Sequence, residues 1–144
     1  MTLEVSYGII PFRRRSEKIE VLLIQHQVGH WAFPKGRPDP NEHPIDTAQR
    51  ELQEETGLRI KRLILPEDKL VEHYFFERNG EKVQKKVEYF LAEVEGKLFI
   101  QEDELRDSIW LTPDLIVEQA TYPESKRLCA RVRDFLNQSN KMTI

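Results

Sequence analysis

Hydrophobic residues gather along this chain in short runs whose period is mostly that of extended strands. Runs over residues 5–12 and 19–25 predict two strands, and the second is nearly continuous in Val, Leu and Ile, which is typical of a strand buried on both faces. Residues 31–33, 58–65 and 109–111 predict three shorter extended segments. These segments are therefore expected to be strands of a sheet.

A hairpin is the strongest strand signal. Segments 70–77 and 83–94 are joined around Asn79-Gly80, a dipeptide that suits the left-handed backbone of a tight hairpin turn. Residues 96–104 follow as an acidic loop.

Three segments begin with helix signals. Residues 44–56 begin with proline after a capping candidate, His43 or Asn41, and end at Gly57, a left-handed stop. Thr112 is expected to cap a second helix with proline at its first position. The last helix starts at Pro123, and its apolar residues recur at helical spacing: Leu128, Val132, Phe135 and Leu136. Strands followed by helices predict an α+β fold with a mixed β-sheet sandwiched between α-helices.

Composition narrows the classes of function. The 144 residues suit a single domain over residues 1–144, and a net charge of −3 gives no electrostatic footprint for nucleic acid. The sequence shows no secretory signal and no apolar stretch of membrane-spanning length. Cys129 is the only cysteine and is expected to be a packed thiol, so we expect a reducing, cytoplasmic location and no membrane partner.

Carboxylates gather on one face of the helix over residues 44–56. Glu51, Glu54 and Glu55 stand at i, i+3 and i+4, opposite an apolar stripe formed by Ile45, Ala48 and Leu52. Arg50 can brace Glu54 or Glu42. Carboxylates clustered in this way repel each other, and Mg²⁺ or Mn²⁺ prefers such oxygen ligands. The cluster predicts metal-assisted attack of water on a phosphate.

The frame around that helix is specific. Residues 36–58 fill every position of G-x5-E-x7-R-E-U-x-E-E-x-G-U, where U is a bulky aliphatic residue. This pattern resembles the box of the Nudix hydrolases, which cleave pyrophosphate linkages in nucleoside diphosphate derivatives. The resemblance implies a helix–sheet–helix Nudix fold with Glu42 as a structural brace. It also implies catalytic roles for Arg50, Glu51, Glu54 and Glu104, and metal ligands at Gly36, Glu51, Glu54, Glu55 and Glu104.

Segments outside the box indicate which subgroup of the Nudix hydrolases the chain resembles. GHWAFPKG at 29–36, KKVEYFLAEV at 85–94 and IWL at 109–111 are similar to asymmetrical diadenosine tetraphosphate hydrolases, which give ATP and AMP. In that group Glu104, counted back from IWL, matches a glutamate of the metal site. The one departure is Asn41, where a glycine is common, and asparagine tolerates the same backbone.

The same resemblance implies substrate ligands. Lys35, His30 and Lys85 would contact phosphate, although strand register leaves Lys82 and Lys86 as rivals of Lys85, and His30 can equally be structural. Tyr122 would stack on a base, with Tyr74 or its rival Phe76 on the other side. Other aromatic residues are expected in the core: Trp31, Phe33, Phe75 and Tyr89. The three arginines at 13–15 are expected to form a solvated turn.

Other functions stay open at this point. An RNA 5′-pyrophosphohydrolase acting on capped RNA ends, a sanitising nucleoside triphosphate pyrophosphatase and a non-catalytic nucleotide sensor all fit the box. A sensor would be expected to have lost some of the box carboxylates, and this chain keeps them. We expect a monomer whose partner is a nucleoside polyphosphate.

Overall fold

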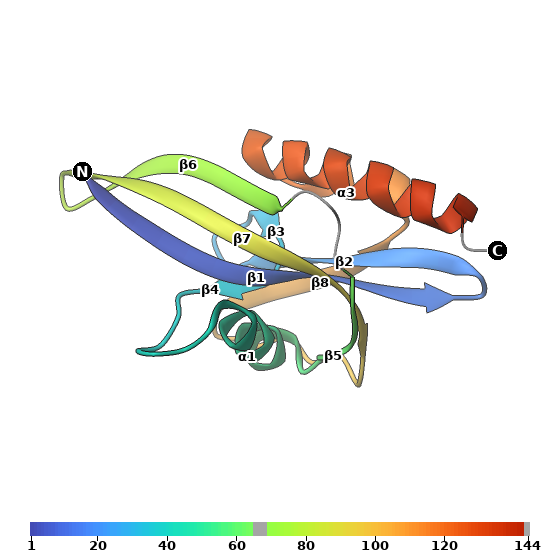
Figure 1. The fold of residues 1–144 in the computed structure, drawn as a ribbon. Coiled ribbons are helices and arrows are strands. Elements are labelled where there is room, and N and C mark those ends of the chain that lie inside the picture. The colour runs from blue at the N-terminus through green and yellow to red at the C-terminus, as the bar shows by residue number, and fades with distance from the viewer. Residues whose placement is uncertain (65–68, 143–144) are drawn as a thin grey trace.

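The computed structural model describes residues 1–64 and 69–142, whose strands form one mixed sheet between helices (Figure 1). The strands are β1 (Thr2–Arg15), β2 (Lys18–His26), β3 (Trp31–Ala32), β4 (Lys35–Gly36), β5 (Arg59–Ile64), β6 (Leu70–Arg78), β7 (Glu81–Glu95) and β8 (Leu105–Leu111). The helices are α1 (Pro44–Thr56), a 3₁₀ turn η1 (Pro113–Leu115), α2 (Ile116–Gln119) and α3 (Pro123–Met142). The expected α+β architecture, a mixed sheet between helices, is confirmed.

The centre of the sheet is a parallel pair. β1 and β7 run side by side from Thr2↔Val83 to Phe12↔Glu93, and the order across the sheet is β3-β2-β1-β7-β5. β6 pairs with the first part of β7, β4 with the middle of β1, and β8 with β2. The other described pairings are antiparallel. β4 therefore lies beside the midpoint of β1, where Gly36 pairs with Tyr7 and Lys35 with Gly8.

Each face of the sheet carries its own hydrophobic core. α1 packs Ala48 and Leu52 against Ile9 and Leu22 on one face. α3 packs its apolar residues on the other face, with Phe12 and Leu91 of the sheet: Leu128, Cys129, Val132 and Leu136. Val21, Leu22, Leu23 and Ile24 of β2 are all fully buried, as expected for a strand covered on both sides. Cys129 is a buried free thiol, as predicted.

Several boundaries follow the sequence signals closely. α1 has the predicted bounds, and Gly57 ends it in the left-handed conformation with φ 77°. Asn79 and Gly80 have φ of 53° and 78°, which fits the predicted hairpin turn between β6 and β7. Leu65, the expected end of β5, lies outside the described residues. No helix in the described part of the chain is long and apolar enough to cross a membrane.

Three local predictions were wrong. The arginines at 13–15 end β1 rather than forming a turn, because Arg13 pairs with Glu20 at 2.8 Å and its guanidinium lies 4.1 Å from the centre of the Trp110 ring. β8 begins at Leu105, earlier than the expected 109–111, because it pairs with β2 along its length. The expected side-chain caps are absent: neither His43 nor Thr112 makes a capping hydrogen bond.

Candidate active site

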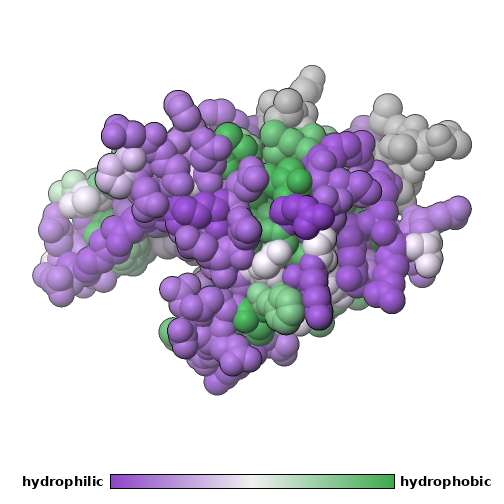
Figure 2. Space-filling view, turned by 90° about the horizontal axis from the view of Figure 1, so that it is seen from below, coloured by the Kyte–Doolittle hydropathy of each residue, from purple (hydrophilic) through white to green (hydrophobic). Residues whose placement is uncertain are grey.

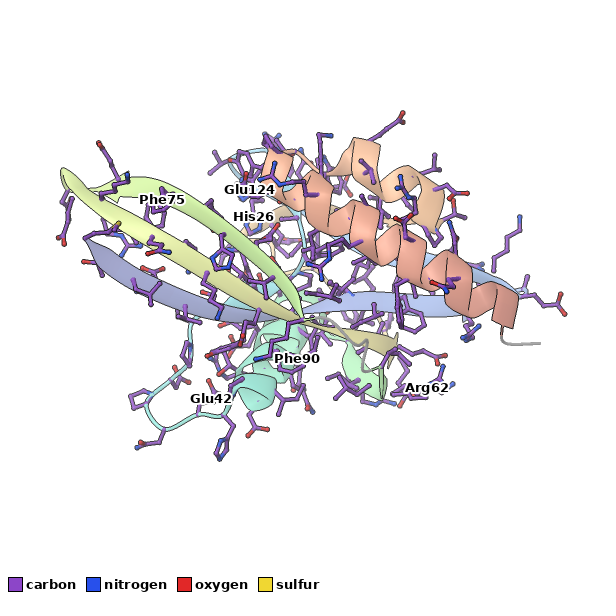
Figure 3. All side chains as sticks on the ribbon, turned by 45° about the horizontal axis from the view of Figure 1, so that its top comes forward. His26, Glu42, Arg62, Phe75, Phe90 and Glu124 are labelled. Atoms are coloured by element: carbon purple, nitrogen blue, oxygen red, sulfur yellow. The ribbon has the colours of Figure 1, made fainter. Side chains whose placement is uncertain are left out.

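The loop before α1 is fastened to the helix by one arginine. The Arg50 guanidinium donates from Nε to Oε2 of Glu42 at 2.9 Å and from Nη2 to Oε1 at 3.0 Å. Thr47 Oγ1 and the backbone N–H of Asp39 donate to the same carboxylate at 2.7 and 3.0 Å. These bonds, with the Arg50 guanidinium first among them, lower the pKa of Glu42 to about 2. Glu42 therefore stays ionised and fixes the loop, as its predicted bracing role requires (Figure 3).

The same arginine also contacts two carboxylates of α1, Glu51 and Glu54. Arg50 Nη1 lies 3.0 Å from Oε1 of Glu51 and 3.3 Å from Oε2 of Glu54. Glu54 points outward, with 58% of its side chain exposed, and Glu51 is largely covered. One cation thus balances part of the negative charge on this helix face.

Glu55 turns inward instead. It is buried, its Oε2 has no hydrogen-bond partner among the described residues, and burial raises its pKa to about 9. Glu51 and Glu104 raise this pKa further, while Lys35 lowers it. Burial, and then the charges of Glu54 and Glu104, likewise raise the pKa of Glu51 despite Arg50. Glu104, about fifty residues beyond the box, has therefore been brought into the field of the α1 carboxylates.

This set of oxygens suits a hard divalent cation. In the described residues as placed, no three His, Cys, Asp or Glu side chains already converge on one metal position. The carboxylates nevertheless raise one another's pKa, and one buried oxygen lacks a partner. A Mg²⁺ or Mn²⁺ ion would relieve both features, so the residues fit the predicted metal.

Backbone packing holds the box glycine against the carboxylates. A Cβ on Gly36 would overlap the carboxylate of Glu51, so a side chain at this position would displace that carboxylate. Lys35, its neighbour, pairs with Gly8 of β1 and lies toward the opposite face of the sheet. β4 thus places Gly36 beside α1 and Lys35 on the opposite face of the sheet. Figure 2 shows the α1 side of the molecule, where hydrophilic residues predominate and a narrow hydrophobic band remains.

An aromatic pocket of about 530 Å³ lies beyond Lys35, between β6 and the start of α3. It is lined by His30, Ala32, Lys35, Glu72, Tyr74, Phe75, Phe76, Tyr122, Glu124 and Ser125. Tyr74 and Phe76 project from the same face of β6, with ring centroids 6.3 Å apart, so the structure brings both predicted rivals into the pocket. Tyr122 stands across from them, 44% exposed. Figure 3 shows Phe75 on β6 and Glu124 at the start of α3.

His30 reaches this pocket through a stacked pair. The rings of His26 and His30 lie 4.2 Å apart and nearly parallel, and His30 lies 5.3 Å from the Tyr122 ring. Burial, with Lys35 adding to it, lowers the pKa of both imidazoles, to about 4 for His26. Nδ1 of His30 is buried with no hydrogen-bond partner among the described residues. His30 is thus a neutral ring at the pocket wall.

The register of β7 decides between the three hairpin lysines. Lys85 faces inward and is 5% exposed, donating to Glu4 Oε1 at 2.7 Å and Ser6 Oγ at 2.6 Å. Lys86 points to the other face, and Lys82 lies over the Phe75 ring. Glu4 also accepts from Arg78 at 2.9 Å. In this structure, two of the hydrogen-bond donor positions of the Lys85 ammonium are taken by protein oxygens.

The core predictions for aromatic residues were mostly right. Phe33 and Tyr89 are buried, with rings 5.7 Å apart, and Trp31 packs against the same core. Phe75 was wrongly expected there: it is 55% exposed, because its neighbours Tyr74 and Phe76 take the inward face of β6.

Sequence reasoning missed four polar residues near the site. Glu4 holds Lys85, and three line the pocket: Glu72, Glu124 and Ser125. Glu72 shares strand parity with Tyr74, which was the one available signal, while Glu4 becomes a neighbour of Lys85 only through the parallel pairing of β1 with β7.

The chain resembles known proteins along most of its length. It is 37% identical over 142 residues to the asymmetrical bis(5′-nucleosyl)-tetraphosphatase of Rattus norvegicus, covering 90% of this chain and 92% of the rat protein. The structure of a C. elegans Ap4A hydrolase binary complex superposes with a TM-score of 0.73, at 27% identity, over 94% of this chain and 98% of that one. A shorter stretch of 46 residues, 32% of this chain, is 52% identical to the RNA pyrophosphohydrolase of Bartonella henselae, 26% of whose length it covers.

The family itself is settled by a match over nearly the whole fold. The NUDIX domain model matches residues 2–132, a range that includes α1, the β4 glycine and the aromatic pocket. With its box complete and its fold shared, this chain belongs to the Nudix hydrolase family.

Proposed function

We propose that this enzyme hydrolyses dinucleoside polyphosphates in a metal-dependent reaction, converting diadenosine tetraphosphate to ATP and AMP. The observation that carries the proposal is the arrangement along β4. Gly36 packs against the Glu51 carboxylate, and Lys35 lines an aromatic pocket large enough for a nucleoside. Lys35 thus lies between the aromatic pocket, which would hold the base, and the carboxylates of α1.

Binding in this proposal positions one end of the substrate. Tyr122 and Tyr74, with Phe76 as the alternative, stack on the base, an interaction worth roughly 1–3 kcal/mol. Lys35 neutralises phosphate charge at the junction of the two sites. His30 donates a hydrogen bond to phosphate, and Lys85 provides a further positive charge on β7. Because one adenosine is fixed in the pocket, one phosphate is placed beside α1.

Hydrolysis would then occur beside α1. The metal would be held by the carboxylates of Glu51, Glu54, Glu55 and Glu104 and the backbone of Gly36, and when bound it supplies charge stabilisation and a more acidic water. Arg50 keeps Glu51 and Glu54 on one side of the site, and Glu104 approaches from the loop before β8. Water adds to the phosphate fourth from the fixed adenosine, and the bridging bond to the third phosphate breaks. ATP leaves from one side and AMP from the other.

The relatives support this substrate class. The rat protein is named as an asymmetrical bis(5′-nucleosyl)-tetraphosphatase, and the superposed C. elegans structure is an Ap4A hydrolase. The likeness to the Bartonella RNA pyrophosphohydrolase covers a third of the chain. An RNA end is therefore the second candidate substrate.

The test is an analysis of early products with Mg²⁺. The substrates are diadenosine tetraphosphate, a 5′-triphosphorylated or capped RNA, and nucleoside triphosphates including oxidised ones. We expect equimolar ATP and AMP from the dinucleotide, with the highest kcat/KM in the panel. ADP as the sole product would refute the proposal, and so would a clear preference for the RNA end. Binding without turnover of any of them would identify a nucleotide sensor.

A further inference from the structure

A buried carboxyl group lies in the wall of the aromatic pocket and has no role in the mechanism above. Glu72 stands two residues before Tyr74 on β6, so both side chains project from the same face of the strand. It lines the same pocket as Tyr74 and Tyr122, yet only 4% of it is exposed. It is therefore a buried polar group in a pocket that aromatic rings line together with Lys35, Glu124 and Ser125.

The surroundings of Glu72 provide hydroxyl groups and no direct cation. The Tyr89 hydroxyl donates to Oε1 of Glu72 at 2.9 Å, and no salt bridge reaches Glu72 within the ranges that the structure describes. Burial raises the pKa of Glu72 and the charge of Glu124 adds to the rise, while the hydroxyls of Ser125 and Tyr89 and the charge of Lys35 oppose it. A buried carboxyl group that no cation contacts directly favours its neutral form. A neutral carboxyl can donate one hydrogen bond and accept others.

The hydrogen-bond donor and acceptor of a neutral Glu72 carboxyl match the hydrogen-bonding edge of one class of nucleobase. Adenine presents an amino donor beside a ring-nitrogen acceptor, the pattern that Asn and Gln side chains recognise with two hydrogen bonds. A neutral carboxyl group has the same donor–acceptor arrangement as an amide. Guanine instead presents a ring N–H beside an amino group, two adjacent donors that would need a carboxylate.

We propose that the Glu72 carboxyl selects the nucleobase in this pocket, pairing with a base that carries an amino group beside a ring-nitrogen acceptor, as adenine does. The aromatic rings give affinity for any base, since every base has a flat face to stack. Glu72 adds the discrimination between bases. The inference rests on the proposed function for the identity of the pocket as a nucleotide site.

Binding of mononucleotides tests the inference without turnover. Calorimetry with AMP, GMP and purine riboside 5′-monophosphate, which lacks the amino group, measures discrimination directly. The unmodified enzyme should bind AMP about tenfold more tightly than either of the others, the effect expected for one or two hydrogen bonds in a buried site. Equal binding of AMP and the purine analogue would overturn the proposal before any variant is made.

Two substitutions distinguish the effect of hydrogen bonding between Glu72 and the base from the effect of the shape of this side chain. Glu72→Gln keeps the size and the donor–acceptor pair, so the preference for AMP should persist within about threefold. Glu72→Met removes both polar groups at similar length, and the AMP-to-GMP affinity ratio should fall about tenfold. A folded Met variant with an unchanged ratio would show that Glu72 does not read the base.

Two controls address a purely structural role. Tyr89→Phe removes the hydrogen bond to Glu72 but leaves the carboxyl in the pocket, so it should lower the unfolding temperature and keep the AMP preference. If Tyr89→Phe reproduces the loss seen in Glu72→Met, Glu72 merely anchors Tyr89 and the proposal is wrong. Glu77→Gln changes an exposed glutamate of the same strand and should leave the ratio unchanged.

The same variants keep this inference distinct from the proposed function. A preference for AMP that depends on Glu72, with no hydrolysis of diadenosine tetraphosphate, would refute the proposed function and support selection of the base by Glu72. Asymmetrical hydrolysis of the adenine dinucleotide to ATP and AMP and of the guanine dinucleotide to GTP and GMP, with equal kcat/KM, would do the reverse.

Discussion

The carboxylates of α1 are adjacent in sequence but differ in environment. Glu54 is exposed and touches Arg50, whereas Glu55 is buried with its pKa raised to about 9. Without a cation, Glu55 favours its neutral form near pH 7, and a bound cation would favour the ionised form. Glu104 matters because its charge reaches both Glu51 and Glu55 from a separate loop.

A prediction for Glu104 follows from that position. Glu104→Gln should lower kcat by about a hundredfold or more, because the site loses a charge opposite α1, while KM and the unfolding temperature change little. Steady-state kinetics on diadenosine tetraphosphate checks this. Glu102→Gln and Asp103→Asn are matched controls in the same loop and should be nearly silent. Equal losses in all three variants would mean that loop charge, rather than Glu104 itself, is what matters.

Tyr122 provides a second prediction at the level of one residue. It is 44% exposed, so Tyr122→Ala should cost little stability. Loss of base stacking should raise KM by the equivalent of roughly 1–3 kcal/mol with kcat nearly unchanged, since stacking acts equally on the ground and transition states. Kinetics and thermal unfolding, measured together, decide the matter. A large fall in unfolding temperature with an unchanged KM would assign Tyr122 to the core.

Among the elements, β2 ends at a half-buried histidine, His26, just before the turn to β3. His26 donates its backbone N–H to the His30 carbonyl at 2.9 Å and accepts from Gly29 at 2.8 Å, which places its ring against His30. Burial first, and then His30 and Lys35, lower the pKa of His26 from 6.5 to about 4. Between these values the unfolded chain binds a proton that the folded one does not.

The contribution of His26 to stability should therefore fall as pH falls from about 6.5 toward 4. The contribution of His26 is at most about 2 kcal/mol, after a discount for its partial exposure to solvent. Urea unfolding at pH 7 and pH 4.5 measures it. His26→Gln should reduce the difference between the two pH values, and an identical pH dependence in the variant would exclude His26 as the source.

The elements also show what sequence could and could not predict. Pro44 and Gly57 mark the ends of α1, and Asn79-Gly80 marks the hairpin, so local chemistry was enough for both. The polar ends of β1 and β8 were missed because partner strands, not their own residues, keep them extended. Glu4 was missed for a related reason, since its neighbour Lys85 comes from a strand far away in sequence.

On the scale of the whole molecule, the residues that hold the fold together are not those that we propose as metal ligands. Two hydrophobic cores hold the layers together, and Arg50 already balances part of the carboxylate charge. A chelator should therefore abolish hydrolysis while lowering the unfolding temperature by no more than a few degrees. Parallel activity and thermal unfolding measurements, with Mg²⁺ restored afterwards, test this. Collapse of the fold in chelator would assign the metal a structural role.

The parallel pair at the centre of the sheet also sets the order of events during synthesis. β1 pairs with residues 83–93, about eighty positions later, so β1 leaves the ribosome before its central partner and waits until the hairpin has emerged. Contacts this distant in sequence close slowly and leave strand edges exposed meanwhile. The turn at Asn79-Gly80, which delivers β7 already paired to β6, shortens that interval. Weakening this turn should therefore reduce the yield of folded enzyme more than it reduces the activity of the molecules that do fold.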